Sequence, residues 1–358
     1  MGVDALLLTE DDVRAILAQP QSTLAAIDAM QAAFAEHGRG AFVSPPRVHV
    51  DDPPGSGGER SGRSLRVLPC IAPSIGGAAC RVYTMDKEAG AGTPAPCELI
   101  LLFDAHSMEL RAVIEDYSLH TLRTAAPTGV AVRALAPPRV GAIGVIGTGR
   151  QARGQLAAAA SVCTAGELRV FGRDPARREA FAVEMSDVLG RPVQVAASGR
   201  DAVRDAGVVL VATNTAEPAL ERSWLQDDAL VVSIAPGELA PDVVLDACLV
   251  PCAAEEVLSG TPRWEPVRTL VEQRQIDPAV LEPSLGELVA GTRKLQREPG
   301  GVTVFLSTGM AFWDLAIADW LDREARRLGL GKPLLPGGGS RTGLGFVSPR
   351  ASAVVNGG

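Results

Sequence analysis

The chain of 358 residues contains no apolar run that approaches the roughly twenty residues of a membrane span. Its first residues, Met-Gly-Val-Asp-Ala, also lack the basic start and apolar block of a secretory signal. These absences predict a cytoplasmic protein without a membrane partner.

An excess of basic charge is also lacking. The 34 Lys and Arg residues are outnumbered by 42 Asp and Glu residues, which gives a formal net charge of −8 and argues against non-specific binding of nucleic acid. Six cysteines follow neither a disulfide framework nor a metal-ligand spacing, so we expect reduced thiols and no metal. Aromatic residues make up only 4%, so a pocket walled mainly by aromatic rings is not expected.

The most informative segment is 140–154, which is Val-Gly-Ala-Ile-Gly-Val-Ile-Gly-Thr-Gly-Arg-Gln-Ala-Arg-Gly. Its order predicts a strand, a tight glycine turn and a helix, which together bring backbone N–H groups and the positive end of a helix dipole to a pyrophosphate. A second strand is expected at 168–171, so the segment predicts a Rossmann domain. The residues expected to line the pyrophosphate are Gly147, Thr148, Gly149, Gln151 and Ala152.

The end of that second strand indicates which dinucleotide is bound. An acidic residue there favours NAD, whereas a small residue with nearby cations accommodates the 2′-phosphate of NADP. Gly172 occupies this position, and Arg173 and Arg178 follow, so the sequence favours NADP(H) over NAD(H). Asp174 is expected to cap the next helix, but a register two residues different would place it on the ribose and favour NAD.

The remaining segments predict an α+β unit before the Rossmann unit. A short strand is expected at 6–8, and strands at 65–69, 78–83, 97–104 and 111–115 are expected to form an antiparallel sheet. Helices are expected after Thr9 and at 22–37, 118–135, 281–298 and 310–328. The last helix is expected to return to the first unit. Residues 333–358, rich in glycine, proline and serine, predict a flexible tail.

Several of these motifs resemble those of the ornithine cyclodeaminase/μ-crystallin family of NAD(P)-dependent enzymes. The most specific combination is Arg-Thr-Ala-Ala just ahead of Gly-x-Gly-x-Gln-Ala. The matching segments are 6–13, 45–48, 122–126, 147–152 and 307–316. The resemblance implies an α/β fold in which a Rossmann domain, 129–307, is inserted into an α+β substrate-binding and dimerisation domain, 1–128 and 308–332. It also implies a homodimer.

The resemblance also implies which residues bind the substrate. Arg47 and Arg123 match the family's substrate arginines, whose guanidinium groups bind a carboxylate through two parallel hydrogen bonds. Arg81 takes the place of a family lysine and is expected to bind the substrate anion. Unlike lysine, arginine does not release its proton, so Arg81 is not expected to donate one.

Further residues are assigned by the same resemblance. Glu238 replaces the family's catalytic aspartate and is expected to stabilise the iminium charge and handle its proton, with Asp242 as the alternative. Asp314 is expected close to the nicotinamide. The other residues expected at the cofactor are Thr124, Thr213, Asn214, Ser307 and Gly309. His49, His106 and His120 match no catalytic position and are expected to be packed or solvated.

Together these features predict an NADPH-dependent oxidoreductase that reduces a C=N bond next to a carboxylate in a small imino or amino acid. Imine reductases, ketimine reductases and amino-acid dehydrogenases, including opine-type enzymes, fit this prediction. One alternative is a cyclodeaminase-type lyase, and the other is a non-catalytic protein that binds NADP(H) and a small acid. The sequence does not name the substrate.

Overall fold

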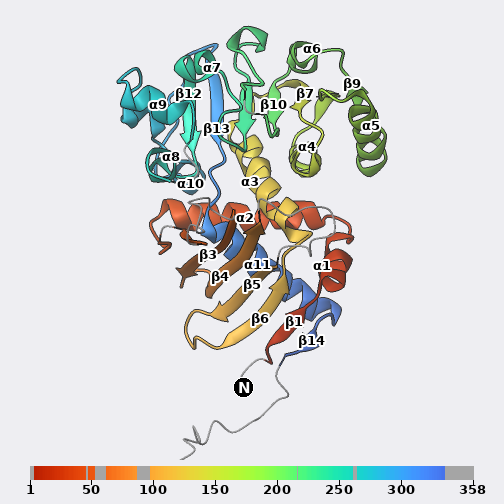
Figure 1. Ribbon diagram of the computed structural model, residues 1–358, viewed down its shortest axis with the longest axis vertical. Helices are drawn as coiled ribbons and strands as arrows, with labels where there is room; N and C mark the ends of the chain where they lie inside the picture. The colour runs from red at the N-terminus through yellow and green to blue at the C-terminus, as the bar shows by residue number, and fades with distance from the viewer. Residues whose placement is uncertain are drawn as a thin grey trace, which may run out of the picture.

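The computed structural model describes residues 4–45, 47–52, 62–86, 97–215, 217–260 and 264–334. Two β-sheets with helices packed on them form the molecule (Figure 1). The helices are α1 (Glu10–Leu17), α2 (Ser22–Gly38), α3 (Leu119–Leu135), α4 (Arg150–Val162), α5 (Pro175–Leu189), α6 (Gly199–Val203), α7 (Pro241–Leu245), α8 (Ala254–Leu258), α9 (Val267–Glu272), α10 (Leu285–Ala290) and α11 (Ala311–Leu328).

The first sheet contains strands from both ends of the described chain. Its order is β14 (Lys332–Pro333), β1 (Leu6–Leu8), β6 (Leu110–Glu115), β5 (Glu98–Asp104), β4 (Gly77–Asp86), β3 (Arg63–Ala72) and β2 (Val48–Asp51). The strands expected to form an antiparallel sheet, β3 to β6, pair in this way, whereas β1 pairs with β6 in parallel, which the sequence did not indicate. Side chains alternate between the two faces, and those that point toward α11 are buried.

The second sheet is parallel throughout its described strands. Its order is β12 (Ala247–Pro251), β13 (Val302–Leu306), β11 (Leu230–Ser233), β10 (Val208–Val211), β7 (Val140–Ile146), β8 (Ala165–Phe171) and β9 (Gln194–Val195). The chain order reverses between β7 and β10, and such a reversal opens a crevice at the carboxyl ends of the strands. This is the Rossmann arrangement, so the predicted fold class is confirmed. The exact domain boundaries remain a prediction.

Two helices connect the sheets to the site. α3 packs against α4 on the Rossmann side and against α2 on the other side (Figure 1). α11 crosses one face of the first sheet and is buried on almost all of its surface. Both helices therefore have little freedom to shift relative to the strands.

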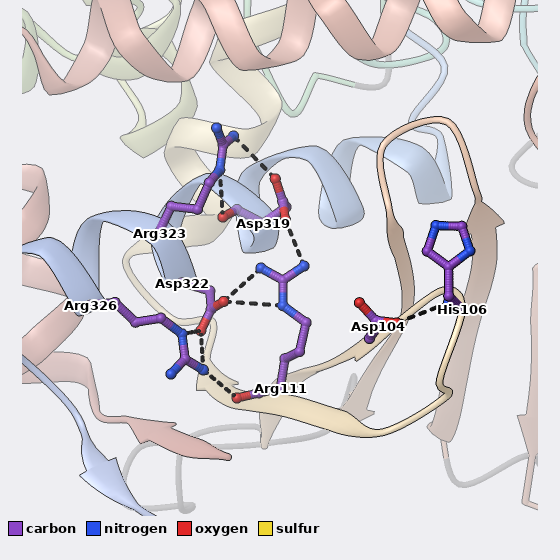
Figure 2. Close-up of polar contacts among 7 residues, drawn as sticks. All are labelled: Asp104, His106, Arg111, Asp319, Asp322, Arg323 and Arg326. Carbon is purple, nitrogen blue, oxygen red and sulfur yellow. Dashed lines mark hydrogen bonds and ion pairs between the residues drawn. The ribbon is translucent and has the colours of Figure 1, made fainter. Parts of the chain in front are cut away.

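An ion-pair network fixes α11 against β6 (Figure 2). Arg111 of β6 donates hydrogen bonds to Asp319 at 2.8 Å and to Asp322 at 2.6 Å, and Arg326 donates to Asp322 at 3.0 Å. Asp322 is only 1% exposed, so its charge requires these partners. The network prevents α11 from rotating about its own axis. The rotational position of the helix determines the direction in which Asp314, near its start, points.

Other expectations have mixed outcomes. A single helix over 281–298 is wrong, because α10 begins at the capping residue Ser284 and ends where Gly291 adopts a left-handed conformation with φ 70°. The predicted tail, apart from its first two residues, lies outside the described residues. Within the described ranges, no helix has the length and hydropathy needed to cross a bilayer.

Candidate active site

A cleft of about 920 Å³ lies at the carboxyl ends of β7, β8, β10 and β11. Its walls come from 146–151, 171–174, 212–215, 217–219 and 234–235, together with His120, Thr124, Arg177, Gly199 and Trp224. Of the residues expected at the cofactor, those that line this cleft are Thr124, Gly147, Thr148, Gly149, Gln151, Gly172, Arg173, Thr213 and Asn214. Ala152 is buried in α4, and Arg178, Ser307 and Gly309 lie outside the lining.

The turn after β7 has the shape that a pyrophosphate requires. Gly147 has φ +119°, and a Cβ there would lie 2.1 Å from the carbonyl oxygen of Ala212, so only glycine fits. A Cβ at Gly149 would meet nothing within 4 Å, so the space in front of α4 is open. Gly149 caps α4 without a side-chain hydrogen bond, which leaves the first N–H groups of this helix available to an anion. These residues fit a nicotinamide dinucleotide.

The rim beside the end of β8 combines a glycine with arginines. A Cβ at Gly172 would lie 2.7 Å from Cγ2 of Thr148, so any larger side chain at this position would require the Thr148 side chain to shift. Arg173 and Arg177 both line the cleft. The rim therefore presents Arg173 and Arg177 beside Gly172, and Asp174 also belongs to the lining.

Two neighbouring residues stabilise this rim. Asp174 caps α5 and accepts a hydrogen bond from the N–H of Arg177 at 3.1 Å, as expected for a helix N-cap. Arg178 donates to the carbonyl oxygen of Gly172 at 3.1 Å, and its guanidinium lies 5.4 Å from the ring centroid of Phe171. Arg178 is placed to support the turn, and its predicted contact with the cofactor remains a prediction.

Glu238 lies beneath the cleft wall with 1% of its surface exposed. One carboxylate oxygen accepts hydrogen bonds from the N–H of Thr213 at 2.6 Å and from its hydroxyl at 3.3 Å. The other oxygen accepts from the hydroxyl of Ser233 at 3.0 Å and from the N–H groups of Ile234 and Ala235 at 3.1 and 3.0 Å. The carboxylate thus ties together the ends of β10 and β11, which form part of the cleft wall.

Burial raises the pKa of Glu238 to about 7, although the hydrogen bonds from Thr213 and Ala235 act in the opposite direction. The predicted role of Glu238 as the acid at the iminium stays a prediction, and its present contacts are to backbone and hydroxyl groups. The alternative, Asp242, is exposed at the start of α7 and accepts a hydrogen bond from the N–H of Arg222 at 3.3 Å.

A charge cluster, formed by Arg81, Asp116, Arg123 and Asp314 with Glu98 at its edge, lies where the first sheet meets α3 and α11. Arg81 donates hydrogen bonds to Asp116 and, at 2.7 Å, to Glu98. Asp314 is fully buried, and its Oδ1 lies 3.8 Å from Nε of Arg81 and 3.6 Å from Nε of Arg123. Each buried charge in the cluster therefore faces an opposite charge.

The two arginines of the charge cluster differ in how fully their N–H groups are hydrogen-bonded. Arg81 is 1% exposed, is bonded on two sides, and lies over the ring of Tyr83, so this arrangement does not favour its predicted contact with substrate. Burial opposes the charge of Arg81, but Asp314 and Asp116 outweigh it, so its pKa is raised. Burial lowers the pKa of Arg123, whose Nε has no hydrogen-bond partner. Arg123 lies outside the cleft lining, and its predicted contact with the substrate carboxylate remains a prediction.

The structure places Arg47 in a second, smaller cavity of about 140 Å³, together with Glu256 and Gly309. Nε of Arg47 is buried without a partner, and a Cβ at Gly309 would lie 3.4 Å from its guanidinium. Burial raises the pKa of Glu256, while the charge of Arg47 opposes this shift. Ser307 lies nearby in sequence, is 4% exposed, and donates its N–H to the carbonyl oxygen of Ser233 at 3.0 Å.

His120 is one of the residues of the cleft that the sequence analysis did not place there. It lines the cleft beside Thr124, whereas His106 lies in the exposed turn between β5 and β6 (Figure 2) and His49 lies on β2. A signal was present, because His120 precedes Arg123 by three residues and Thr124 by four, so the three share one side of a helix. His120 matches no family motif, so the spacing alone did not indicate a place in the cleft.

Comparisons with known proteins agree with the motifs. The model of the ornithine cyclodeaminase/mu-crystallin family matches residues 9–327. A Delta(1)-pyrroline-2-carboxylate reductase of Bacillus cereus is 24% identical over 271 residues, which are 74% of this chain and 83% of the relative. The ketimine reductase mu-crystallin of Rattus norvegicus is 26% identical over 317 residues, which are 87% and 94% of the two chains.

Solved structures show the same fold. Delta(1)-pyrroline-2-carboxylate reductase of Thermococcus litoralis, in complex with NADH and L-proline, superimposes with a TM-score of 0.80 at 27% identity and covers 91% of this chain and 99% of its own. An archaeal alanine dehydrogenase dimer with bound NAD gives a TM-score of 0.79 at 23% identity, with coverage of 92% and 98%.

The bracing contacts of Glu238 generate a prediction. In the Glu238→Gln variant, an NH₂ group must face backbone N–H groups whichever way the amide is turned, so unfolding should become easier by about 1–3 kcal/mol. The wild-type carboxyl has a raised pKa in the folded state, so its contribution to stability is present below pH 4.5 and is lost as the pH rises through about 7. The stability difference between wild type and variant, measured by urea unfolding, should therefore be larger at pH 5 than at pH 8.

Asp242→Asn is the matched control, because this neighbouring carboxylate is exposed and should change the unfolding free energy by less than about 0.5 kcal/mol. A Glu238→Gln variant with wild-type stability but greatly reduced turnover would contradict the bracing role and support direct participation in the reaction.

Proposed function

The chain belongs to the ornithine cyclodeaminase/mu-crystallin family, and from this premise we propose that it reduces a C=N bond next to a carboxylate with a nicotinamide cofactor. The observation that carries the proposal is the cleft itself, which has a pyrophosphate turn on one wall and the first turns of α3 on another. The similarity to a reductase that binds NADH and L-proline supports the same reaction class.

Arg123 is the residue best suited to bind the substrate carboxylate. It follows His120 by one helical turn, and His120 lines the cleft. Oδ1 of Asp314 lies 3.6 Å from Nε of Arg123 without a hydrogen bond between them. The charge of Asp314 therefore orients the guanidinium, but it does not occupy the hydrogen-bond donors of the group. Arg81 then acts through the charge cluster, because its two carboxylate partners fix the surroundings of Asp314.

The reaction can be tested with purified protein, a reduced cofactor and a panel of cyclic 2-imino acids and of 2-oxo acids with amines. We expect oxidation of the cofactor that depends on an imino acid. Arg123→Lys should raise KM for the imino acid and lower kcat/KM by about tenfold to a hundredfold, because lysine cannot form the two parallel hydrogen bonds. Binding of the cofactor alone should not change.

Arg133→Lys is the control. Arg133 lies on the same helix but outside the cleft lining, and its Nη1 lies 2.6 Å from Oδ1 of Asp28. Release of ammonia from ornithine without net change of the cofactor would identify a lyase instead. Tight cofactor binding without turnover of any imine would identify a binding protein.

NADP(H) is the proposed cofactor in preference to NAD(H). The support comes from the rim beside β8, where Arg173 and Arg177 line the cleft and Gly172 leaves no carboxylate for a ribose 2′-hydroxyl. Asp174 is engaged as a helix cap, which reduces its capacity to bind the ribose.

Replacement of both arginines, Arg173→Ser with Arg177→Ser, should weaken NADPH binding by tenfold or more, because charge-assisted contacts with the 2′-phosphate are lost. NADH binding should change by less than about threefold. Calorimetry or nucleotide fluorescence measures both affinities, and Arg200→Ser, at an exposed residue outside the cleft lining, serves as the control. Wild-type protein that binds NADH more tightly than NADPH would overturn the preference.

A homodimer is proposed through the face of the first sheet that points away from α11. Most side chains on this face are apolar and only partly buried, namely Val67, Pro69, Ile71, Val82, Leu99, Leu101, Phe103 and Val113, with Glu115 at one end. A contiguous apolar surface of this kind is typical of an interface between subunits. The archaeal alanine dehydrogenase with the same fold is described as a dimer.

Leu101→Arg places a charge in the middle of this face and should convert a dimer into a monomer, because the charge would be buried without a partner. Light scattering on a sizing column measures the change, and circular dichroism checks that the fold is kept. Val183 on α5 is 72% exposed, so Val183→Arg should leave the dimer intact. A monomeric wild-type protein, or a dimeric Leu101→Arg variant, would exclude this interface.

A further inference from the structure

His120 lies at the boundary between the cofactor cleft and the charge cluster. It is in the first turn of α3 and lines the cleft with Thr124, whose hydroxyl donates to the carbonyl oxygen of His120 at 2.8 Å. Nδ1 of His120 is buried and lies 3.5 Å from Oε2 of Glu98, which also accepts a hydrogen bond from Arg81. The ring is 28% exposed, so the opposite edge, with Nε2, is the part left for the cleft.

Other acidic groups near the cleft are poorly placed to move a proton. Glu238 is closed off beneath the wall, and Asp314 is sealed within the charge cluster. Asp174 caps α5 beside the β8 rim, and Glu217 is exposed. Among the described residues that line the cleft, His120 thus combines a titratable ring, partial burial and a carboxylate partner.

We propose that Nε2 of His120 donates the proton that the substrate nitrogen takes up during C=N reduction, with Glu98 as the residue that positions the imidazole. This inference rests on the proposed reductase function. When bound, the reduced nicotinamide supplies a hydride to the imine carbon, and the π pair of the C=N bond moves to nitrogen. His120 gives this nitrogen its proton from Nε2, and the neutral imidazole regains a proton from water.

The surroundings of His120 affect how readily its imidazolium gives up a proton. Burial lowers its pKa and so do the charges of Arg123 on α3 and Arg81 on β4, whereas the carboxylate of Glu98 on β5 raises it. A pKa below the ordinary value makes the imidazolium a better donor, while the carboxylate of Glu98 partly offsets the downward shift. Nδ1 pointing to Glu98 also fixes which nitrogen faces the cleft.

The first test needs no turnover. In the full-length protein, the titration of the His120 ring is followed by nuclear magnetic resonance, with His120→Gln used to assign its signal. Glu98→Gln should shift the midpoint of this titration to lower pH, because removal of the carboxylate removes its stabilisation of the imidazolium. A midpoint that does not move would overturn the positioning role of Glu98.

The second test uses turnover with a cyclic imino acid. His120→Gln should lower kcat by about a hundredfold or more, while its affinity for NADPH, measured separately, stays within about threefold of wild type. The wild-type kcat should fall as the pH rises through the pKa of His120, and this decline should disappear in His120→Gln. In Glu98→Gln the same decline should begin at lower pH.

His106→Gln, in the exposed turn between β5 and β6, is the matched control and should behave as wild type. If His120→Gln keeps its kcat and loses only NADPH affinity, His120 is a cofactor contact and the inference fails, while the reductase function stands. If wild type turns over no imine, the proposed function fails and the inference fails with it.

Discussion

The site depends on the balance of buried charges between Arg81, Arg123, Asp116 and Asp314. These side chains come from β4, α3, the short connection between β6 and α3, and α11, so four separate parts of the chain must meet in one arrangement. A buried charge that lost its partner would cost several kcal/mol, on the order of 3–5, which excludes most shifts of these elements. Because α3 also lines the cofactor cleft, the charge cluster fixes the substrate side of the site relative to the cofactor side.

The arginine at position 81 has consequences for the rest of the site. A guanidinium keeps its proton and directs its N–H groups in a fixed plane, so two carboxylates can engage it fully. A lysine in this place would be a smaller donor with a pKa that burial can lower. With arginine, the buried position serves to orient neighbouring groups, and a proton for the substrate must come from a different side chain.

Local chemistry explains which parts of the fold were predictable. The strand over 140–146 and the turn at Gly147 follow from apolar residues, a positive φ and a close approach to Ala212, all within a short segment or its immediate neighbour. The parallel pairing of β1 with β6 depends on residues more than a hundred positions apart, and no local pattern specifies it. Gly291 could have marked the end of α10, but the helix-forming residues at 293–298 concealed the stop.

The site was predictable as a set of positions and less so as a set of side-chain directions. Motif matching located Glu238 next to the cleft wall, but only the structure shows that five donors surround its buried carboxylate. A side chain of glutamate length reaches both strand ends at once, and this satisfies N–H groups that would otherwise be buried without acceptors. The shape of the cleft thus depends on a residue that does not line it, which explains why an acidic residue at this position need not be an acid catalyst.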